Sequence, residues 1–192
     1  MTEKKYTNPA TIALHAGWRK DETTNSVTVP IHMTSSYQFD STDHAANLFA
    51  LSELGNIYSR IMNPTNAVFE ERIAALEGGV AALGLASGQA ASAYAIQNLC
   101  SNGDNFVASS HLYGGTYNQF KNPFSDMGIE VRFVDPSDPQ NFADATDDKT
   151  RAYYGEVLPN PSFQVFPLQE VADLGRPLGI PLIVDNTAAP LI

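Results

Sequence analysis

A carboxylate at the end of an apolar run is the first candidate for chemistry in this sequence. Leu182-Ile183-Val184 leads directly to Asp185. An ionised carboxylate at the end of a buried strand needs a partner, because burying an unpaired charge is costly. A cationic group of a ligand could be that partner. The ordinary alternative is an aspartate that caps the segment after it.

A second candidate is the stretch Ser87-Gly88-Gln89, which opens a predicted helix. Free backbone N–H groups and the positive end of a helix dipole favour an anion such as a phosphate. The same residues also make a good tight turn and helix start, so the pattern alone leaves both readings open. Neither the dinucleotide fingerprint G-x-G-x-x-G nor a Walker loop is present.

Three further positions carry side chains that could contact a ligand: Tyr113, Asn160 and Arg60. Tyr113 precedes the glycine pair Gly114-Gly115, so a flat ligand could stack on its ring at a sheet edge. A loop tyrosine packed on its neighbours is the alternative. Asn160 stands between two prolines, which restrict the backbone and aim its amide, although an ordinary turn is equally possible.

Arg60 brings a fork of donors suited to a phosphate or a carboxylate. Tyr58 lies two residues before it. In an extended segment both side chains would point the same way. A surface ion pair is the simpler explanation for Arg60.

Alternating strands and helices must position these residues. Short apolar strands separated by helices favour a parallel sheet with helices on both faces, an α/β fold in which ligands bind at the carboxyl ends of the strands. The expected strands are 80–87, 105–110, 129–134, 151–158 and 180–185. The expected helices are 63–77, 88–100, 116–127 with a break at Pro123, 138–145 and 167–178.

Residues 1–62 are irregular and form an expected amino-terminal arm, whereas residues 63–192 form the expected main domain. The arm has one predicted helix, 41–54, with Ser41 as its cap and Ala45, Leu48, Phe49 and Leu51 as its apolar face. An arm of this kind is often stable only when it packs on something else.

The composition is that of a globular protein. Of 192 residues, 43% are hydrophobic and 17% charged, and the net charge of −10 disfavours nucleic acid or anionic membrane as a partner. The single cysteine, Cys100, follows an apolar stretch and is expected to be a packed thiol. With no signal peptide and no membrane-spanning run, the sequence predicts a cytoplasmic protein without a metal site.

Taken together and in order, these motifs resemble the amino-terminal part of the cysteine/methionine-metabolism family of pyridoxal-phosphate (PLP) enzymes of fold type I. The motifs are TIALHAG (11–17), VPIHMTSSYQF (29–39), IYSRIMNPTN (57–66), LEGGVAALGLASGQAA (76–91), LYGGTY (112–117) and IVDNT (183–187). Within the family, SGQAA and the segment from residue 39 to 65 look most like the O-acetylhomoserine sulfhydrylase branch.

The resemblance implies PLP as the cofactor and a role for each candidate. Asp185 resembles the aspartate that pairs with the pyridinium nitrogen. Tyr113 resembles the tyrosine that stacks on the ring and assists proton transfers, and Asn160 resembles the asparagine near the 3′-oxygen. Residues Ser87, Gly88, Gln89 and Thr187 complete the implied cofactor site.

The resemblance also implies an oligomer. Tyr58 and Arg60 match residues that reach the phosphate in a neighbouring subunit, so the arm would pack on another protomer of a homotetramer built from dimers that share active sites. The implied reaction is γ-replacement, in which O-acetylhomoserine and a sulfur donor such as sulfide give homocysteine and acetate, in methionine biosynthesis.

One expected element is missing. The family needs a lysine that forms a Schiff base with the cofactor, downstream of the aspartate. None of the five lysines follows Asp185; they are Lys4, Lys5, Lys20, Lys121 and Lys149. We therefore expect that the chain is the first portion of a longer enzyme whose carboxyl-terminal domain is absent, and that it is inactive alone.

Four alternatives stay open at this point. Two are a cystathionine γ-synthase and a cystathionine or methionine γ-lyase of the same family. The third is a nucleotide-binding dehydrogenase, which would want the glycine fingerprint that is lacking. The fourth is a non-catalytic fragment that acts as an assembly partner.

Overall fold

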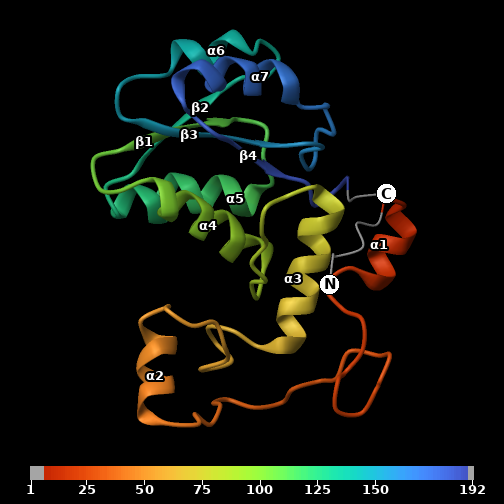
Figure 1. The fold of residues 1–192 in the computed structure, drawn as a ribbon. Coiled ribbons are helices and arrows are strands. Elements are labelled where there is room, and N and C mark those ends of the chain that lie inside the picture. The colour runs from red at the N-terminus through yellow and green to blue at the C-terminus, as the bar shows by residue number, and fades with distance from the viewer. Residues whose placement is uncertain (1–6, 190–192) are drawn as a thin grey trace. The chain divides into compact units, whose positions relative to one another are not determined.

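The computed structural model describes residues 7–189, which divide into two compact units (Figure 1). Unit 1 ends at Gly84 and unit 2 begins at Leu85. Within the described residues no helix has the length and apolar character needed to cross a membrane. The predicted contact of an arm, residues 1–62, with a neighbouring subunit stays a prediction.

Unit 2 is built on a four-stranded parallel sheet. Its strands are β1 (Asn105–Ser109), β2 (Glu130–Val134), β3 (Thr150–Glu156) and β4 (Leu182–Asp185), in the order β2-β1-β3-β4. All three pairings are parallel, as predicted. β1 is buried along its whole length, which fits its apolar centre, Phe106-Val107-Ala108.

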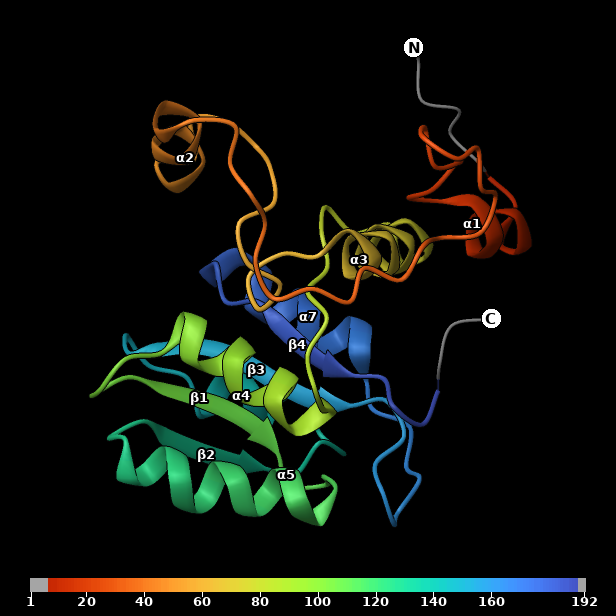
Figure 2. The ribbon, with the colours of Figure 1, turned by 90° about the horizontal axis from the view of Figure 1, so that it is seen from below.

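Helices cover both faces of this sheet, which confirms the predicted α/β architecture. α4 (Gly88–Leu99) and α5 (Gly114–Gln119) lie on one face, and α6 (Gln140–Asp144) and α7 (Leu168–Gly175) on the other (Figures 1 and 2). A short 3₁₀ turn, Arg176–Leu178, follows α7. Two apolar clusters fill the spaces between sheet and helices, one around Phe106 and Phe120 and the other around Val107 and Phe142.

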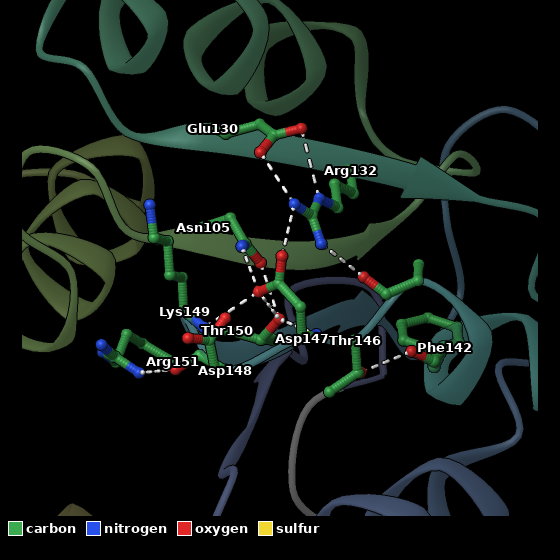
Figure 3. A network of polar contacts seen from close by, with 11 residues as sticks. Asn105, Glu130, Arg132, Phe142, Thr146, Asp147, Asp148, Lys149, Thr150 and Arg151 are labelled. Carbon is green, nitrogen blue, oxygen red and sulfur yellow. Dashed lines mark hydrogen bonds and ion pairs between the residues drawn. The ribbon is translucent and has the colours of Figure 1, made fainter.

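A polar network fastens the amino edge of the sheet (Figure 3). Asp147 accepts a hydrogen bond from the Asn105 amide at 2.8 Å and pairs with Arg132 at 2.8 Å. Thr150 donates to Asn105 at 2.7 Å, and Arg132 also pairs with Glu130 at 3.0 Å. Asn105, Glu130 and Thr150 start β1, β2 and β3, Asp147 precedes β3, and Arg132 lies in the middle of β2. The amino edge is therefore fixed by contacts of its own, and the carboxyl edge is left for the predicted site.

The helix predicted at 116–127 begins earlier and is not broken by Pro123. α5 starts at Gly114 and passes into a π-helical turn, Phe120–Phe124, that contains the proline. Proline lacks the N–H that an α-helix needs, and a widened turn accommodates it. Phe120 and Phe124 are both buried, so the turn keeps them in the core.

Unit 1 contains α1 (Pro9–His15), α2 (Thr42–Phe49) and α3 (Pro64–Glu77). Asn63 caps α3, and Gly78, with φ of 65°, ends it as expected. Ser41 caps α2, but this helix stops five residues before the predicted end. Leu51 adopts a φ of 56°, which a helix does not allow, and of the predicted apolar face only Leu48 is buried.

The strand predicted at 80–87 is wrong. Residues 81–85 have no regular secondary structure, and Val80 is fully exposed. The Gly84 N–H donates to the Glu70 side chain at 2.7 Å, so it does not pair with a strand. The other four predicted strands are confirmed to within about two residues.

Candidate functional site

The predicted ligand-binding residues of unit 2 gather at the carboxyl edge of the sheet, where β1, β3 and β4 end. α4 and α5 also begin at this edge, because each is antiparallel to the strands it covers. The side-chain amide of Gln89 donates to Thr116 at 3.0 Å, and Gln119 donates to the Gln89 carbonyl at 3.1 Å. The two helix starts are therefore held together.

The start of α4 is arranged to receive an anion. The Ser87 hydroxyl accepts the Ala90 N–H at 3.1 Å, which makes Ser87 the cap of the helix. The N–H groups of Gly88 and Gln89, the first two helical residues, have no acceptor within the helix. A Cβ built at Gly88 would meet no atom within 4 Å, so the space in front of this backbone is open.

Tyr113 stands at the start of α5, directly after the loop from β1. The residue is 50% exposed, so its ring is available for stacking. A Cβ at Gly115 would lie 2.5 Å from Cε1 of this ring, so the glycine lets the tyrosine fold back over its own loop. The space that the absent side chain of Gly115 leaves is therefore filled by the Tyr113 ring.

Asp185 ends β4, as predicted. Its Oδ1 accepts hydrogen bonds from the Thr187 N–H at 2.9 Å and from the Thr187 hydroxyl at 2.6 Å. The capping alternative is thus present in the structure, and Thr187 orients the carboxylate. Among residues 7–189 no basic side chain pairs with Asp185.

Glu156 is a residue of this edge that we did not predict. It ends β3, is paired in register with Asp185 and is only 5% exposed. Its Oε1 accepts the Tyr113 N–H at 2.8 Å. The available signal was its position: Glu156 ends β3 on the same face of the sheet as Tyr154.

A buried hydroxyl pair lies behind these carboxylates. The Tyr154 hydroxyl is 2.9 Å from the Ser92 hydroxyl of α4, and both side chains are buried. Burial raises the pKa of Tyr154, and the charges of Asp185 and Glu156 raise it further. The tyrosine therefore stays protonated and supplies a hydroxyl beside the two acids.

Asn160 lies in the turn after β3 and is exposed. Its peptide bond to Pro161 is cis. The sequence places it at the correct edge of the sheet, and the direction of its side chain toward a ligand stays a prediction.

Tyr58 and Arg60 belong to unit 1. The Arg60 guanidinium lies 5.5 Å from the centre of the Tyr58 ring, so the two side chains are neighbours. The extended segment that we predicted is wrong, because Ile61 and Met62 both donate to the Tyr58 carbonyl and residues 59–61 form a turn. Their function toward a phosphate stays a prediction.

None of the described lysines lies at the carboxyl edge of unit 2. Lys121 lies over the Tyr117 ring and lines a hollow with Glu130, the first residue of β2. Lys149 immediately precedes β3 at the amino edge, and Lys20 is in unit 1. Lys4 and Lys5 lie outside the described residues.

The carboxyl edge can therefore bind three chemical features at once. Open backbone N–H groups at Gly88 suit a phosphate, the half-exposed ring of Tyr113 suits a flat ring, and the carboxylate of Asp185 suits a cation. PLP carries all three features, so the residues present fit this cofactor.

Comparison with known proteins gives the same result. The chain is 54% identical over 179 residues to the O-acetyl-L-homoserine sulfhydrylase of Leptospira meyeri, a match that covers 93% of this chain and 40% of that protein. It is 53% identical over 178 residues to O-acetyl-L-homoserine sulfhydrylase 1 of Thermus thermophilus, covering 92% of this chain and 42% of the relative. The chain thus spans less than half the length of these curated relatives.

A solved structure has the same fold. It is that of a Campylobacter jejuni protein assigned as an O-acetylhomoserine (thiol)-lyase, with a pyridoxyl-lysine monophosphate. The TM-score is 0.93 at 39% identity, and the match covers 96% of this chain and 45% of the other. The family model described as Cys/Met metabolism PLP-dependent enzyme matches residues 10–192. The chain therefore belongs to this family of PLP-dependent enzymes.

Proposed function

We propose that the chain is the amino-terminal part of an O-acetylhomoserine sulfhydrylase. The complete enzyme would convert O-acetylhomoserine and sulfide, or another sulfur donor, to homocysteine and acetate in methionine biosynthesis. The observation that carries this proposal is the identity of more than half of the aligned residues with two bacterial O-acetyl-L-homoserine sulfhydrylases.

When bound, PLP supplies a ring that accepts electrons from the reacting carbon of an amino-acid substrate. In our proposal Asp185 keeps a proton on the ring nitrogen, and Thr187 holds that carboxylate in place through its two hydrogen bonds. Ser87, Gly88 and Gln89 bind the phosphate at the start of α4.

Two side chains act beside the ring in this proposal. Tyr113 stacks on it and is the catalytic residue of this chain, because its hydroxyl can move a proton near the substrate. Asn160 binds the 3′-oxygen. Both follow strands at the same edge as Asp185, which supports the assignment.

The remaining phosphate contacts would come from another subunit. Tyr58 and Arg60 are adjacent and exposed, which suits residues that reach into a neighbouring site. The active enzyme would be a homo-oligomer, a tetramer built from dimers that share active sites. The cytoplasmic location predicted from the sequence stays a prediction.

We further propose that these 192 residues alone do not turn over substrate, and that a carboxyl-terminal part of the same enzyme provides the Schiff-base lysine. The chain, mixed with PLP and reduced with borohydride, is expected to give no adduct at a specific lysine. A stoichiometric adduct at Lys121 or Lys149 would contradict this proposal.

The function is tested with the full-length enzyme that contains this chain. It should form homocysteine and acetate from O-acetylhomoserine and sulfide faster than it cleaves cystathionine or methionine. Faster formation of cystathionine from an acylhomoserine and cysteine would assign a cystathionine γ-synthase, and faster cleavage would assign a γ-lyase. Either result would overturn the sulfhydrylase assignment.

A further inference from the structure

Glu156 is an acid that the protein buries at the carboxyl edge of the sheet. Its side chain is 5% exposed, and within residues 7–189 no basic side chain pairs with it. Acids are rarely buried unless something nearby requires them. The partner that the structure provides is a backbone group, the N–H of Tyr113, at 2.8 Å.

Glu156 lies close to the ends of two neighbouring strands. It ends β3 and pairs in register with Asp185 of β4, and it receives the N–H of Tyr113, which follows β1. The N–H of Asn160, in the turn after β3, also favours its charged form. Burial raises the pKa of Glu156 and the Asp185 charge raises it further, whereas the two N–H groups act in the opposite direction.

The bond from the Tyr113 N–H matters because it fixes the backbone of a residue whose ring packs over its own loop at Gly115. Tyr113 begins α5 without a side-chain capping bond, and the residue is 50% exposed. Gly114, the next residue, has open space around it. A backbone N–H that loses its acceptor in a half-buried site would rotate or rearrange to find another one, and the ring would move with it.

We propose that Glu156 is a positioning residue for the cofactor: its carboxylate fixes the Tyr113 backbone so that the tyrosine ring is held at a constant offset from Asp185. This inference rests on the proposed function, in which Tyr113 stacks on PLP and Asp185 meets the ring nitrogen. Glu156 itself need not touch the cofactor.

The test measures PLP dissociation constants of the full-length apoenzyme by equilibrium dialysis. Glu156→Ala should weaken PLP binding by roughly 10-fold, the order expected when a hydrogen bond to a charged acceptor is lost. Glu156→Gln keeps an acceptor oxygen and should stay within about threefold of wild type. If Glu156→Ala does not fold, Glu156→Asp, whose shorter side chain withdraws the acceptor, should show the same loss.

A double-mutant cycle separates positioning from general loss of structure. If Glu156 acts through the ring of Tyr113, adding Glu156→Ala to Tyr113→Ala should weaken binding by less than about twofold more. As a matched control, Asp147 also accepts a backbone N–H, that of Lys149 at 2.9 Å, but at the opposite edge. Asp147→Ala should destabilise the protein and leave the PLP affinity unchanged.

Two results would overturn the inference: unchanged PLP affinity in Glu156→Ala, or fully additive losses in the double variant. Wild-type enzyme that does not bind PLP would instead refute the proposed function. The two failures are therefore distinguishable in one set of measurements.

Discussion

Gly155 gives a sharp test of the packing behind the site. It lies in β3 between Tyr154 and Glu156, and a Cβ at this position would fall 2.5 Å from two carbons of the Phe166 ring. Phe166 is itself 3% exposed and packs edge-on against Phe142 at 5.8 Å, so the ring has no free space to move into.

The expected cost of Gly155→Ala follows from these contacts. Overpacking a closed core costs about 1–3 kcal/mol, and the overlap here suggests the upper end of that range. Replacing a glycine in a strand with alanine stabilises the folded state by about 0.5–1 kcal/mol, which offsets part of this cost. The net loss should be about 2 kcal/mol, which corresponds to a roughly 30-fold larger equilibrium constant for the opening of β3.

The assay is hydrogen–deuterium exchange of the full-length protein, read on a peptide that covers residues 150–156. Gly155→Ala should lower its protection roughly 30-fold. Adding Phe166→Leu, which removes the ring edge, should restore part of the protection, although Phe166→Leu alone is destabilising. Gly88→Ala, where a Cβ meets nothing within 4 Å, should leave the same peptide unchanged. Protection within twofold of wild type in Gly155→Ala would refute the packing argument.

Three further predictions follow. Gly88→Ala should preserve stability but weaken PLP binding at least several-fold, because the methyl group projects into the open space at the start of α4; unchanged affinity in dialysis would contradict this. Burial raises the pKa of Cys100 to about 11, so its thiol should react with Ellman's reagent at pH 8 only after unfolding. Rapid reaction of the native protein would contradict a packed thiol. Burial raises the pKa of Glu156, so the folded state retains a proton that the unfolded chain loses, and stability should fall as pH rises above 4.5 through the folded pKa. Glu156→Gln should remove that fall in urea titrations. The loss of stability below pH 3.8 should remain, because there the unfolded chain gains a proton at Asp147, whereas the folded state, in which the pKa of Asp147 is lowered, keeps the carboxylate ionised.

The sheet of unit 2 could be predicted from local pattern because its two central strands, β1 and β3, are almost entirely buried. Each has an apolar centre bounded by polar residues, and helices separate the strands along the chain. Residues 80–87 are similarly rich in apolar side chains, but they do not form a strand. Apolar composition shows that a segment can be buried, but strand formation also needs a neighbouring strand to accept its backbone bonds.

The site was predictable to the extent that its residues are placed by strand and helix ends. Ser87 lies at the start of a helix and Asp185 at the end of a strand, as the alternation of elements predicted. Glu156 was not predicted, because its partner is a backbone N–H that is 43 residues away in the chain. Such a contact leaves no local pattern. The turn at Arg60 was missed for a similar reason, since nothing in its sequence distinguishes a turn from an extended segment.

The most direct test concerns the proton that Asp185 is proposed to hold. Full-length enzyme loaded with PLP labelled with ¹⁵N in the ring would be compared with Asp185→Asn by NMR at pH 8. Wild type should give the chemical shift of a protonated ring nitrogen, and the variant that of an unprotonated one. A wild-type nitrogen without a proton, or the same protonated shift in both proteins, would contradict it.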